Sequence, residues 1–152
     1  MKKVFFDASV VIAALLSPTG GSAKLLGFAK NKKIVAITSQ TVIDEVTDHT
    51  EKIRKTPEKI FSYVKESGLL VRERVTQTEI EKVSGIVDST DAHLIVGARG
   101  AACQYLVTLD KKHLLRSDIR KNVAPLHIVN PKELLKKLSI PFPHPFPTRY
   151  NT

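Results

Sequence analysis

The chain contains very little cysteine, and this absence excludes several kinds of site. Cys103 is the only cysteine among the 152 residues. The chain therefore cannot form an internal disulfide, and it cannot build a cysteine-based zinc site. The neighbouring residues in AACQYLV are mostly apolar, so we expect Cys103 to fill space in the core.

Long apolar runs are also missing. The run from Val10 to Leu16 is far shorter than the ~20 residues that a membrane-spanning helix needs. Asp7 interrupts the apolar stretch near the N-terminus that a signal peptide would require. We therefore expect a cytoplasmic protein with no membrane partner. No G-x-G-x-x-G sequence follows the first apolar run, which argues against a dinucleotide-binding enzyme.

Positive charge, in contrast, is in excess. Lys and Arg total 24 against 15 Asp and Glu, which gives a net charge of +9. This excess favours a polyanionic partner, with nucleic acid as the first candidate, although a basic surface without a partner is the alternative. The 42% hydrophobic and 26% charged residues are typical of a soluble globular protein. The length suits one domain with a sizeable core.

Predicted strands alternate with predicted helices along the chain. Short β-branched or aromatic runs predict strands at residues 2–6, 34–38, 69–75, 105–109 and 126–129. Helical periodicity and capping residues predict helices at residues 8–16, 21–33, 40–53, 56–66, 78–87, 89–102 and 131–138, with a helix or loop at 111–117. This alternation predicts an α/β fold with a parallel sheet that helices cover on both faces.

The C-terminal sequence PFPHPFPTRYNT alternates proline with phenylalanine or histidine. Such a segment can form neither a helix nor a central strand. We therefore expect a folded domain over residues 1–138 and a proline-rich tail over residues 139–152, either loose or packed on a partner subunit.

Two acids follow predicted central strands. Asp7 comes directly after VFF, and Asp110 comes directly after YLVTL. Ligands of doubly wound parallel sheets collect at the carboxyl ends of the strands. Either acid alone could be a helix cap or a turn residue. Two acids at equivalent strand ends favour a functional site.

Helical periodicity singles out one acid in the predicted helix 40–53. Its apolar face is formed by Val42, Ile43, Val46 and Ile53. Glu45 lies on the border of this face, where it could look into a cleft. Asp44 and Asp48 point toward solvent. His49 falls on the inward side, and we interpret it as a core histidine.

The predicted helix 89–102 contributes another acid. Asp91 falls on the apolar stripe of this helix, whereas His93 falls on the far side. Ser89 or Thr90 is available as a cap, so Asp91 is not needed for that purpose. A carboxylate that faces the core needs a cation to compensate its charge.

The candidate acids are therefore Asp7, Glu45, Asp91 and Asp110, with Asp88 as a fifth candidate. Carboxylates that converge would repel one another and raise one another's pKa values. Divalent cations relieve that repulsion, and ligation by oxygen alone favours Mg²⁺ or Mn²⁺ over zinc. Such a site suits metal-activated hydrolysis of a phosphodiester bond.

The segments that carry these acids resemble the PIN-domain family of metal-dependent ribonucleases. The matching segments are VFFDASVVIAAL, SQTVIDEV, DSTDAHLIVGARGAACQYLVTLDKKHL and IVNPKELL, which together cover about residues 1 to 137. The resemblance implies an α/β/α sandwich around a parallel sheet of about five strands. It also implies an acidic pocket for Mg²⁺ or Mn²⁺ in which Asp7, Glu45, Asp91 and Asp110 are the catalytic and metal-binding residues.

The resemblance implies supporting roles for three further residues. Ser9 matches a hydroxyl or amide that is usual two residues after the first Asp. Thr108 matches a hydroxyl common before the last Asp. Asp88 matches an acid often seen three residues before the third catalytic position.

In one respect the chain departs from the family. Some relatives carry a further acid just after the last Asp, but here Lys111, Lys112 and His113 follow. One or two cations therefore remain alternatives. The two lysines could contact an RNA backbone or could form a solvated charged face.

The function that the resemblance implies is Mg²⁺- or Mn²⁺-dependent endonucleolytic hydrolysis of RNA, leaving 5′-phosphate and 3′-hydroxyl ends. The last motif is similar to that of toxins from toxin–antitoxin pairs, which implies a homodimer silenced by a small antitoxin. Two alternatives stay open. One is a phosphatase with Asp7 as nucleophile, which would normally need a second Asp where Ser9 stands. The other is a non-catalytic RNA-binding or assembly module with a relict acidic site.

Overall fold

The computed structural model describes residues 1–139 of the chain. Ser139, expected as the first residue of the tail, is the last residue of a helix that begins at Pro131. The remainder of the expected tail, residues 140–152, lies outside the described residues. The division into a domain and a tail therefore stays a prediction.

Within residues 1–139, five parallel strands form one sheet in the spatial order β3-β2-β1-β4-β5. The strands are β1 Lys3–Phe6, β2 Val35–Ser39, β3 Leu70–Arg72, β4 Tyr105–Val107 and β5 His127–Val129. Val4 of β1 pairs with Ala36 on one side and with Tyr105 on the other. Val4, Phe5 and Phe6 are fully buried, as expected for a central strand covered on both faces.

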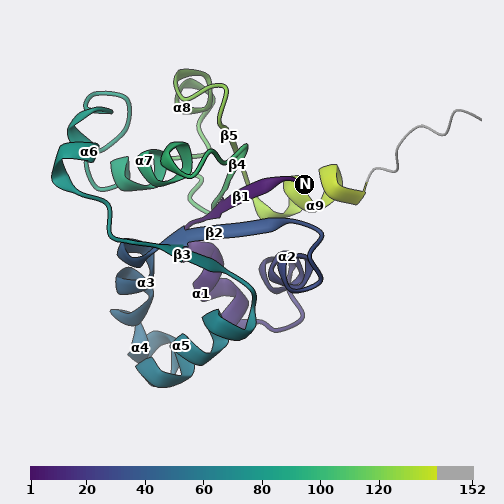
Figure 1. Ribbon diagram of the computed structural model, residues 1–152. Coiled ribbons are helices and arrows are strands. Elements are labelled where there is room, and N and C mark those ends of the chain that lie inside the picture. Colours follow the sequence, from purple (N-terminus) through teal and green to yellow (C-terminus); the bar gives the residue numbers. More distant parts are fainter. Residues whose placement is uncertain (140–152) are drawn as a thin grey trace, which may run out of the picture.

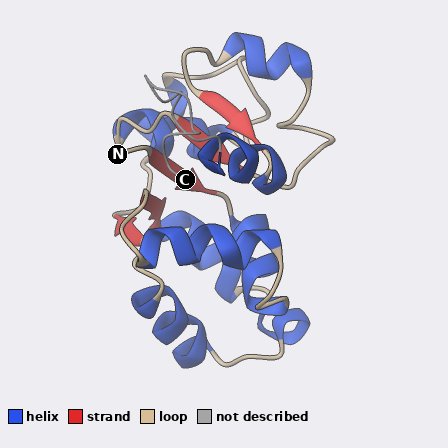
Figure 2. Cartoon of the chain, turned by 90° about the vertical axis from the view of Figure 1, so that its right-hand side faces the viewer, coloured by secondary structure: helices blue, strands red, loops and turns tan. Residues whose placement is uncertain are grey.

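Helices cover both faces of this sheet. In chain order they are α1 Ala8–Leu16, α2 Gly21–Lys30, α3 Gln40–Thr47, α4 Thr50–Ile53, α5 Pro57–Glu66, α6 Gln77–Glu81, α7 Ala92–Gly100, α8 Ser117–Asn122 and α9 Pro131–Ser139. Figure 1 shows α1 to α5 on one face and α6 to α8 on the other, and α9 packs against α2. Figure 2 shows the strands between the two groups of helices. The expected α/β/α sandwich with a five-stranded parallel sheet is confirmed.

Local signals in the sequence set several helix boundaries. The Ser39 hydroxyl accepts a hydrogen bond of 3.1 Å from the Val42 N–H at the start of α3. Thr56 caps α5 in the same way, with Pro57 at the first helical position. Gly68 adopts a φ of +80° between α5 and β3, a conformation that favours glycine.

The order of the strands places a topological switch between β1 and β4. From β1 the chain runs outward through β2 to β3, and then returns to β4 and β5 on the other side of β1. The connections that leave the carboxyl ends of β1 and β4 therefore diverge, and ligands of open α/β sheets bind at such points. Asp7 follows β1 directly, and Thr108 follows β4 directly.

The core contains the lone cysteine. Cys103 is buried beside β4, as expected. Burial raises the pKa of its thiol to about 11, so the group stays protonated at neutral pH. A protonated buried thiol is a poor nucleophile and a poor metal ligand.

The expected helix over residues 40–53 is divided into α3 and α4. The His49 Nδ1 atom lies 2.7 Å from the Glu45 carbonyl oxygen, which the His49 N–H would bond in a continuous helix. That N–H instead bonds the Val46 carbonyl. His49 is exposed at the break, so the interpretation of this residue as a core histidine is wrong.

The expected helix over residues 78–87 ends at Glu81. The N–H groups of Lys82 and Val83 bond carbonyls three residues back, which tightens the chain into turns. Gly85 then takes a φ of +84°, which a regular helix does not contain.

The expected helix over residues 89–102 begins at Ala92, because the N–H groups of Asp91 and Ala92 both bond the Asp88 carbonyl in a turn.

The strands expected at 69–75 and 105–109 are three residues each, Leu70–Arg72 and Tyr105–Val107. The chain also forms α8 just beyond the segment 111–117 that was left open as helix or loop.

Among the described residues, no single helix is long and apolar enough to cross a membrane. The helices α1 and α2 meet that test only as a bent pair, with 99° between them.

Candidate active site

Asp7 lies in the interior at the junction of β1 and α1. It occupies the N-cap position of α1, but its side chain makes no capping hydrogen bond. Only 7% of the residue is exposed. Burial raises the pKa of this carboxyl group, hydrogen bonds from Thr108 and Ser9 oppose that rise, and the negative charge of Glu45 adds to it.

Two hydroxyl groups tie Asp7 to the segment after β4. Ser9 and Thr108 both donate to Asp7 Oδ2, at 2.8 Å and 2.7 Å. The same two hydroxyls accept hydrogen bonds from the N–H groups of Leu109 and Asp110, each at 3.1 Å. The pairing of these N–H groups with side chains explains why β4 ends at Val107. The two hydroxyls fix the position of Asp7 relative to Asp110.

The Asp110 carboxylate stabilises the turn that follows it in the chain. Its Oδ1 accepts hydrogen bonds from the N–H groups of Lys112 and His113, at 3.1 Å and 2.9 Å. Its Oδ2 lies 3.3 Å from His113 Nδ1. The carboxylate is 26% exposed, so one side of it can still meet solvent or a ligand.

Asp91 approaches Asp110 from the other face of the sheet. It is the N-cap residue of α7, which the sequence assigned to Ser89 or Thr90, but its side chain makes no capping bond. Burial raises the pKa of Asp91, and the charges of Asp110 and Asp7 raise it further. Ligand atoms of Asp91, Asp110 and His113 all lie within 4.8 Å of one another.

Glu45 reaches the site from α3, on the face of the sheet that carries α1. Its charge acts on Asp7, which places it beside the buried acid. Its Oε1 atom lies 2.7 Å from His93 Nε2. This contact joins α3 to α7.

The prediction that His93 lies on the far side of its helix is wrong. His93 is buried, with 6% of its surface exposed, and all seven residues from Ala92 to Ala98 are buried as well. A stripe found by periodicity indicates the inward face only when the opposite face meets water. The signal that could have shown this is the run AHLIVGA at residues 92–98, in which His93 is the one polar residue, because a helix that is apolar all round is buried on all sides.

The other acids of these segments differ in their surroundings. Asp88 is exposed, and its charge adds to the rise in the pKa of Asp91. Asp44 is held outside the site by Arg74, whose Nε lies 2.7 Å from Asp44 Oδ2. Asp48 is exposed, as expected.

Asp91 and Asp110 are brought together, with ligand atoms within 4.8 Å of each other. The negative charge of Glu45 raises the pKa of Asp7, and the charges of Asp110 and Asp7 raise the pKa of Asp91. A buried carboxylate among like charges is costly unless a cation compensates it. Oxygen donors crowded in this way fit a hard divalent cation, so the residues present suit Mg²⁺ or Mn²⁺.

A cavity of about 550 Å³ is lined by Ala13 of α1, by Leu135 of α9 and by Leu109 and Lys111, which flank Asp110 in the chain. None of the four acids lines this cavity. Lys111 and Lys112 are both exposed on the turn after Asp110.

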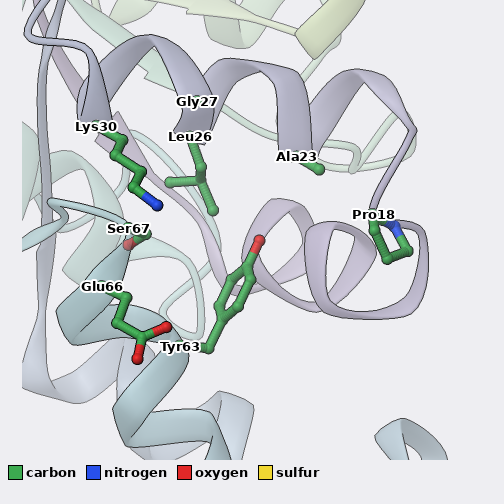
Figure 3. Close-up of a pocket in the computed structure, with 8 residues that line it drawn as sticks. All are labelled: Pro18, Ala23, Leu26, Gly27, Lys30, Tyr63, Glu66 and Ser67. Atoms are coloured by element: carbon green, nitrogen blue, oxygen red, sulfur yellow. The ribbon is translucent and has the colours of Figure 1, made fainter.

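A second cavity, of about 230 Å³, lies between α2 and α5 (Figure 3). Tyr63 of α5 points toward α2 there, and Pro18 borders the cavity just beyond the C-terminal end of α1. Asp7 precedes the opposite end of α1. This cavity is therefore separate from the acidic site.

Comparison with known families gives one match. A family model described as PIN domain matches residues 3–112, more than half of the chain. Asp7, Glu45, Asp91 and Asp110 all fall inside the matched range. Among curated proteins, none matches the chain.

Proposed function

This chain belongs to the PIN-domain family, whose members are generally nucleases, and we propose on that premise that it is a metal-dependent endoribonuclease. The observation that carries the proposal is the set of mutually coupled carboxylates beside the buried Asp7. The net charge of +9 supports a polyanionic substrate.

In this proposal Asp7, Glu45, Asp91 and Asp110 hold Mg²⁺ or Mn²⁺. Such a cation, when bound, supplies Lewis acidity and lowers the pKa of a water molecule that can serve as nucleophile. Ser9 and Thr108 donate to Asp7 Oδ2 and so favour its ionised form. Asp88 adds negative charge at the edge of the site.

The lysines after Asp110 are the candidate RNA contacts. Lys111 and Lys112 are exposed and follow Asp110 directly in the chain. Cationic side chains at this place would bind the phosphates that flank the bond to be cleaved. Hydrolysis by water leaves a 5′-phosphate and a 3′-hydroxyl, which end-group analysis of the products would identify.

We also propose that the protein is the toxin of a toxin–antitoxin pair and acts as a homodimer. The support is the similarity of its last motif to that branch of the family. A small protein encoded next to this chain should then bind it and stop RNA cleavage. Co-expression of the two proteins, followed by measurement of the mass of the complex, tests the partner and the oligomeric state together.

An RNA-cleavage assay with and without Mg²⁺ or Mn²⁺ tests the enzymatic activity. EDTA and the substitution Asp7→Asn should each abolish cleavage. Asp118→Asn is the matched control, because Asp118 is exposed on α8 and pairs with Arg116. Full cleavage by Asp7→Asn, or full cleavage in EDTA, would contradict the proposal. A relict site would instead show no metal binding when Mn²⁺ is titrated by calorimetry.

A further inference from the structure

His113 joins the acidic cluster, although the family match ends at residue 112. One of its ring nitrogens lies within 4.8 Å of carboxylate oxygens of both Asp91 and Asp110. The charge of His113 also opposes the rise in the pKa of Asp91. His113 follows Lys111 and Lys112 in the segment just after Asp110, where some relatives carry a further acid.

The turn after Asp110 brings the ring back toward the acids. The Asp110 carboxylate accepts the His113 N–H at 2.9 Å, and the Asp110 carbonyl accepts the N–H of Leu114 at 3.2 Å. Leu114 is 1% exposed and anchors the end of the turn in the core. Because backbone bonds and a buried side chain hold this turn, the place of the ring does not depend on a flexible loop.

The spacing of these three side chains suits one cation. Metal–ligand distances of about 2.1–2.3 Å put two ligand atoms on opposite sides of an ion about 4.2–4.6 Å apart. The ligand atoms of Asp91, Asp110 and His113 all lie within 4.8 Å of one another, a spacing that is compatible with a single ion between them.

We propose that His113 is a nitrogen ligand of the bound metal, and that the site therefore prefers Mn²⁺ to Mg²⁺. This inference rests on the proposed metal-dependent function. Mg²⁺ takes oxygen ligands almost exclusively and gives up its water reluctantly. First-row transition metals accept imidazole more readily, so replacing a carboxylate by an imidazole shifts the preference toward them.

Three substitutions separate ligation from a structural role of His113. His113→Ala removes the ring but keeps the backbone N–H that Asp110 accepts. His113→Asp replaces the nitrogen by an oxygen ligand. His127→Ala is the control for loss of a histidine, since His127 lies at the start of β5, at the opposite end of the strands from the acids, and packs on Tyr105.

Affinities for Mn²⁺ and Mg²⁺, measured separately by calorimetry without RNA, give the selectivity. We expect His113→Ala to weaken Mn²⁺ binding about tenfold or more and Mg²⁺ binding far less. His113→Asp should lower the ratio of Mn²⁺ to Mg²⁺ affinity while keeping tight Mg²⁺ binding. His127→Ala should leave both affinities unchanged. An unaltered affinity ratio in His113→Ala would overturn the inference.

Pulsed EPR of the Mn²⁺-loaded protein detects the ligand directly. A coordinated imidazole produces nitrogen modulation of the Mn²⁺ signal, which should be present in the wild-type protein and absent from His113→Ala. Modulation that persists in the variant, or is absent from the wild type, would refute ligation by His113. Melting temperatures in EDTA should agree among the variants, which excludes unfolding as the cause.

The failure of this inference and the failure of the proposed function give different results. A protein that cleaves RNA with equal Mn²⁺ and Mg²⁺ affinity, and with no nitrogen modulation, keeps the function and loses the inference. A protein that binds Mn²⁺ through His113 but does not cleave RNA keeps the inference and loses the function.

Discussion

The His93 Nε2 atom lies 2.7 Å from the Glu45 Oε1 atom, which joins the buried helix α7 to the acid of α3. The His93 side chain is 8% exposed, whereas the Glu45 side chain is 42% exposed. Among the described residues, His93 Nδ1 is buried without a hydrogen-bond partner. The Glu45 contact is thus the interaction that orients the ring.

Substitution of His93 should weaken metal binding by releasing Glu45. We expect His93→Leu to lower Mn²⁺ affinity by ~10–100-fold, as loss of a hydrogen bond to a metal ligand commonly does. His93→Gln keeps an N–H donor and should retain more of the affinity. Calorimetry with Mn²⁺ measures the effect. Wild-type affinity in His93→Leu would mean that Glu45 needs no support from α7.

Asp7→Asn should stabilise the metal-free protein at neutral pH while it abolishes activity. A carboxyl group whose pKa is raised by burial binds protons more tightly in the folded than in the unfolded chain. Its charge therefore costs stability above the raised pKa. Asn removes the charge and can still accept from Ser9 and Thr108. We expect a melting temperature ~2–4 °C higher in EDTA, which corresponds to about 1 kcal/mol.

The pH dependence of this stability difference gives a second measurement. As the pH falls through the raised pKa of Asp7, the wild-type carboxyl group takes up a proton and the cost of its charge disappears. The advantage of Asp7→Asn over the wild type should therefore shrink between neutral pH and about pH 4. A difference that stays constant over this range would show that the charge of Asp7 is not the cause. Saturating Mn²⁺ should reverse the order, because bound metal stabilises only the wild type.

As the pH is lowered, metal affinity should begin to fall at a higher pH than it would for a site of ordinary exposed aspartates. Asp7 and Asp91 both have raised pKa values, so they take up protons at a higher pH than exposed aspartates do. Protons compete with the cation for these oxygens. Mn²⁺ titrations of His113→Ala, in which the carboxylates remain the groups for which protons compete, should show affinity that rises with pH between pH 5 and 8. A flat profile over this range would contradict the raised pKa values.

Removing the Thr108 hydroxyl should disturb Asp7 and Asp110 together. The hydroxyl donates to Asp7 Oδ2 and accepts from the Asp110 N–H, and Thr108 is fully buried. Thr108→Val leaves both partners short of one hydrogen bond, which should cost ~1–3 kcal/mol in urea unfolding. Thr108→Ser keeps the hydroxyl and should lose less. A larger loss in Thr108→Ser than in Thr108→Val would assign the cost to the methyl group that serine lacks instead.

The sequence predicted the fold well, because each strand is a short apolar run bounded by clear helix and turn signals. Val4 to Phe6 and the capping residues Ser39 and Thr56 are examples. The proximity of Asp7 and Asp110 followed from the strand ends alone. Selecting Glu45 as a site residue also required the helical periodicity of its segment. The family resemblance selected the same four acids.

The two histidines of the site could not be placed from the sequence. Periodicity put His93 on a solvent face, because the burial of α7 on all sides depends on contacts with distant elements. The sequence marks His113 only as one of three residues that follow Asp110, after Lys111 and Lys112. Its position depends on the turn that the Asp110 carboxylate and Leu114 hold, and no local pattern in the sequence specifies that turn.

Gly97 sets the distance between α7 and β1, and Gly97→Ala should therefore affect both stability and metal binding. A Cβ atom at Gly97 would lie 2.7 Å from Cζ of the fully buried Phe5, so either the Phe5 ring or α7 would have to shift. We expect a loss of ~1–3 kcal/mol in urea unfolding. Because Asp91 directly precedes α7 and Asp7 directly follows β1, the same shift should weaken Mn²⁺ binding.

The matched control is Gly27→Ala in α2, where an added Cβ meets nothing within 4 Å. This substitution should stabilise the protein by ~0.5–1 kcal/mol through helix propensity and leave Mn²⁺ affinity unchanged. If Gly97→Ala lowered stability but left the affinity intact, the two acids would not depend on the close packing of α7 on β1. Loss of both would show that the contact between Gly97 and Phe5 holds Asp91 in reach of Asp7.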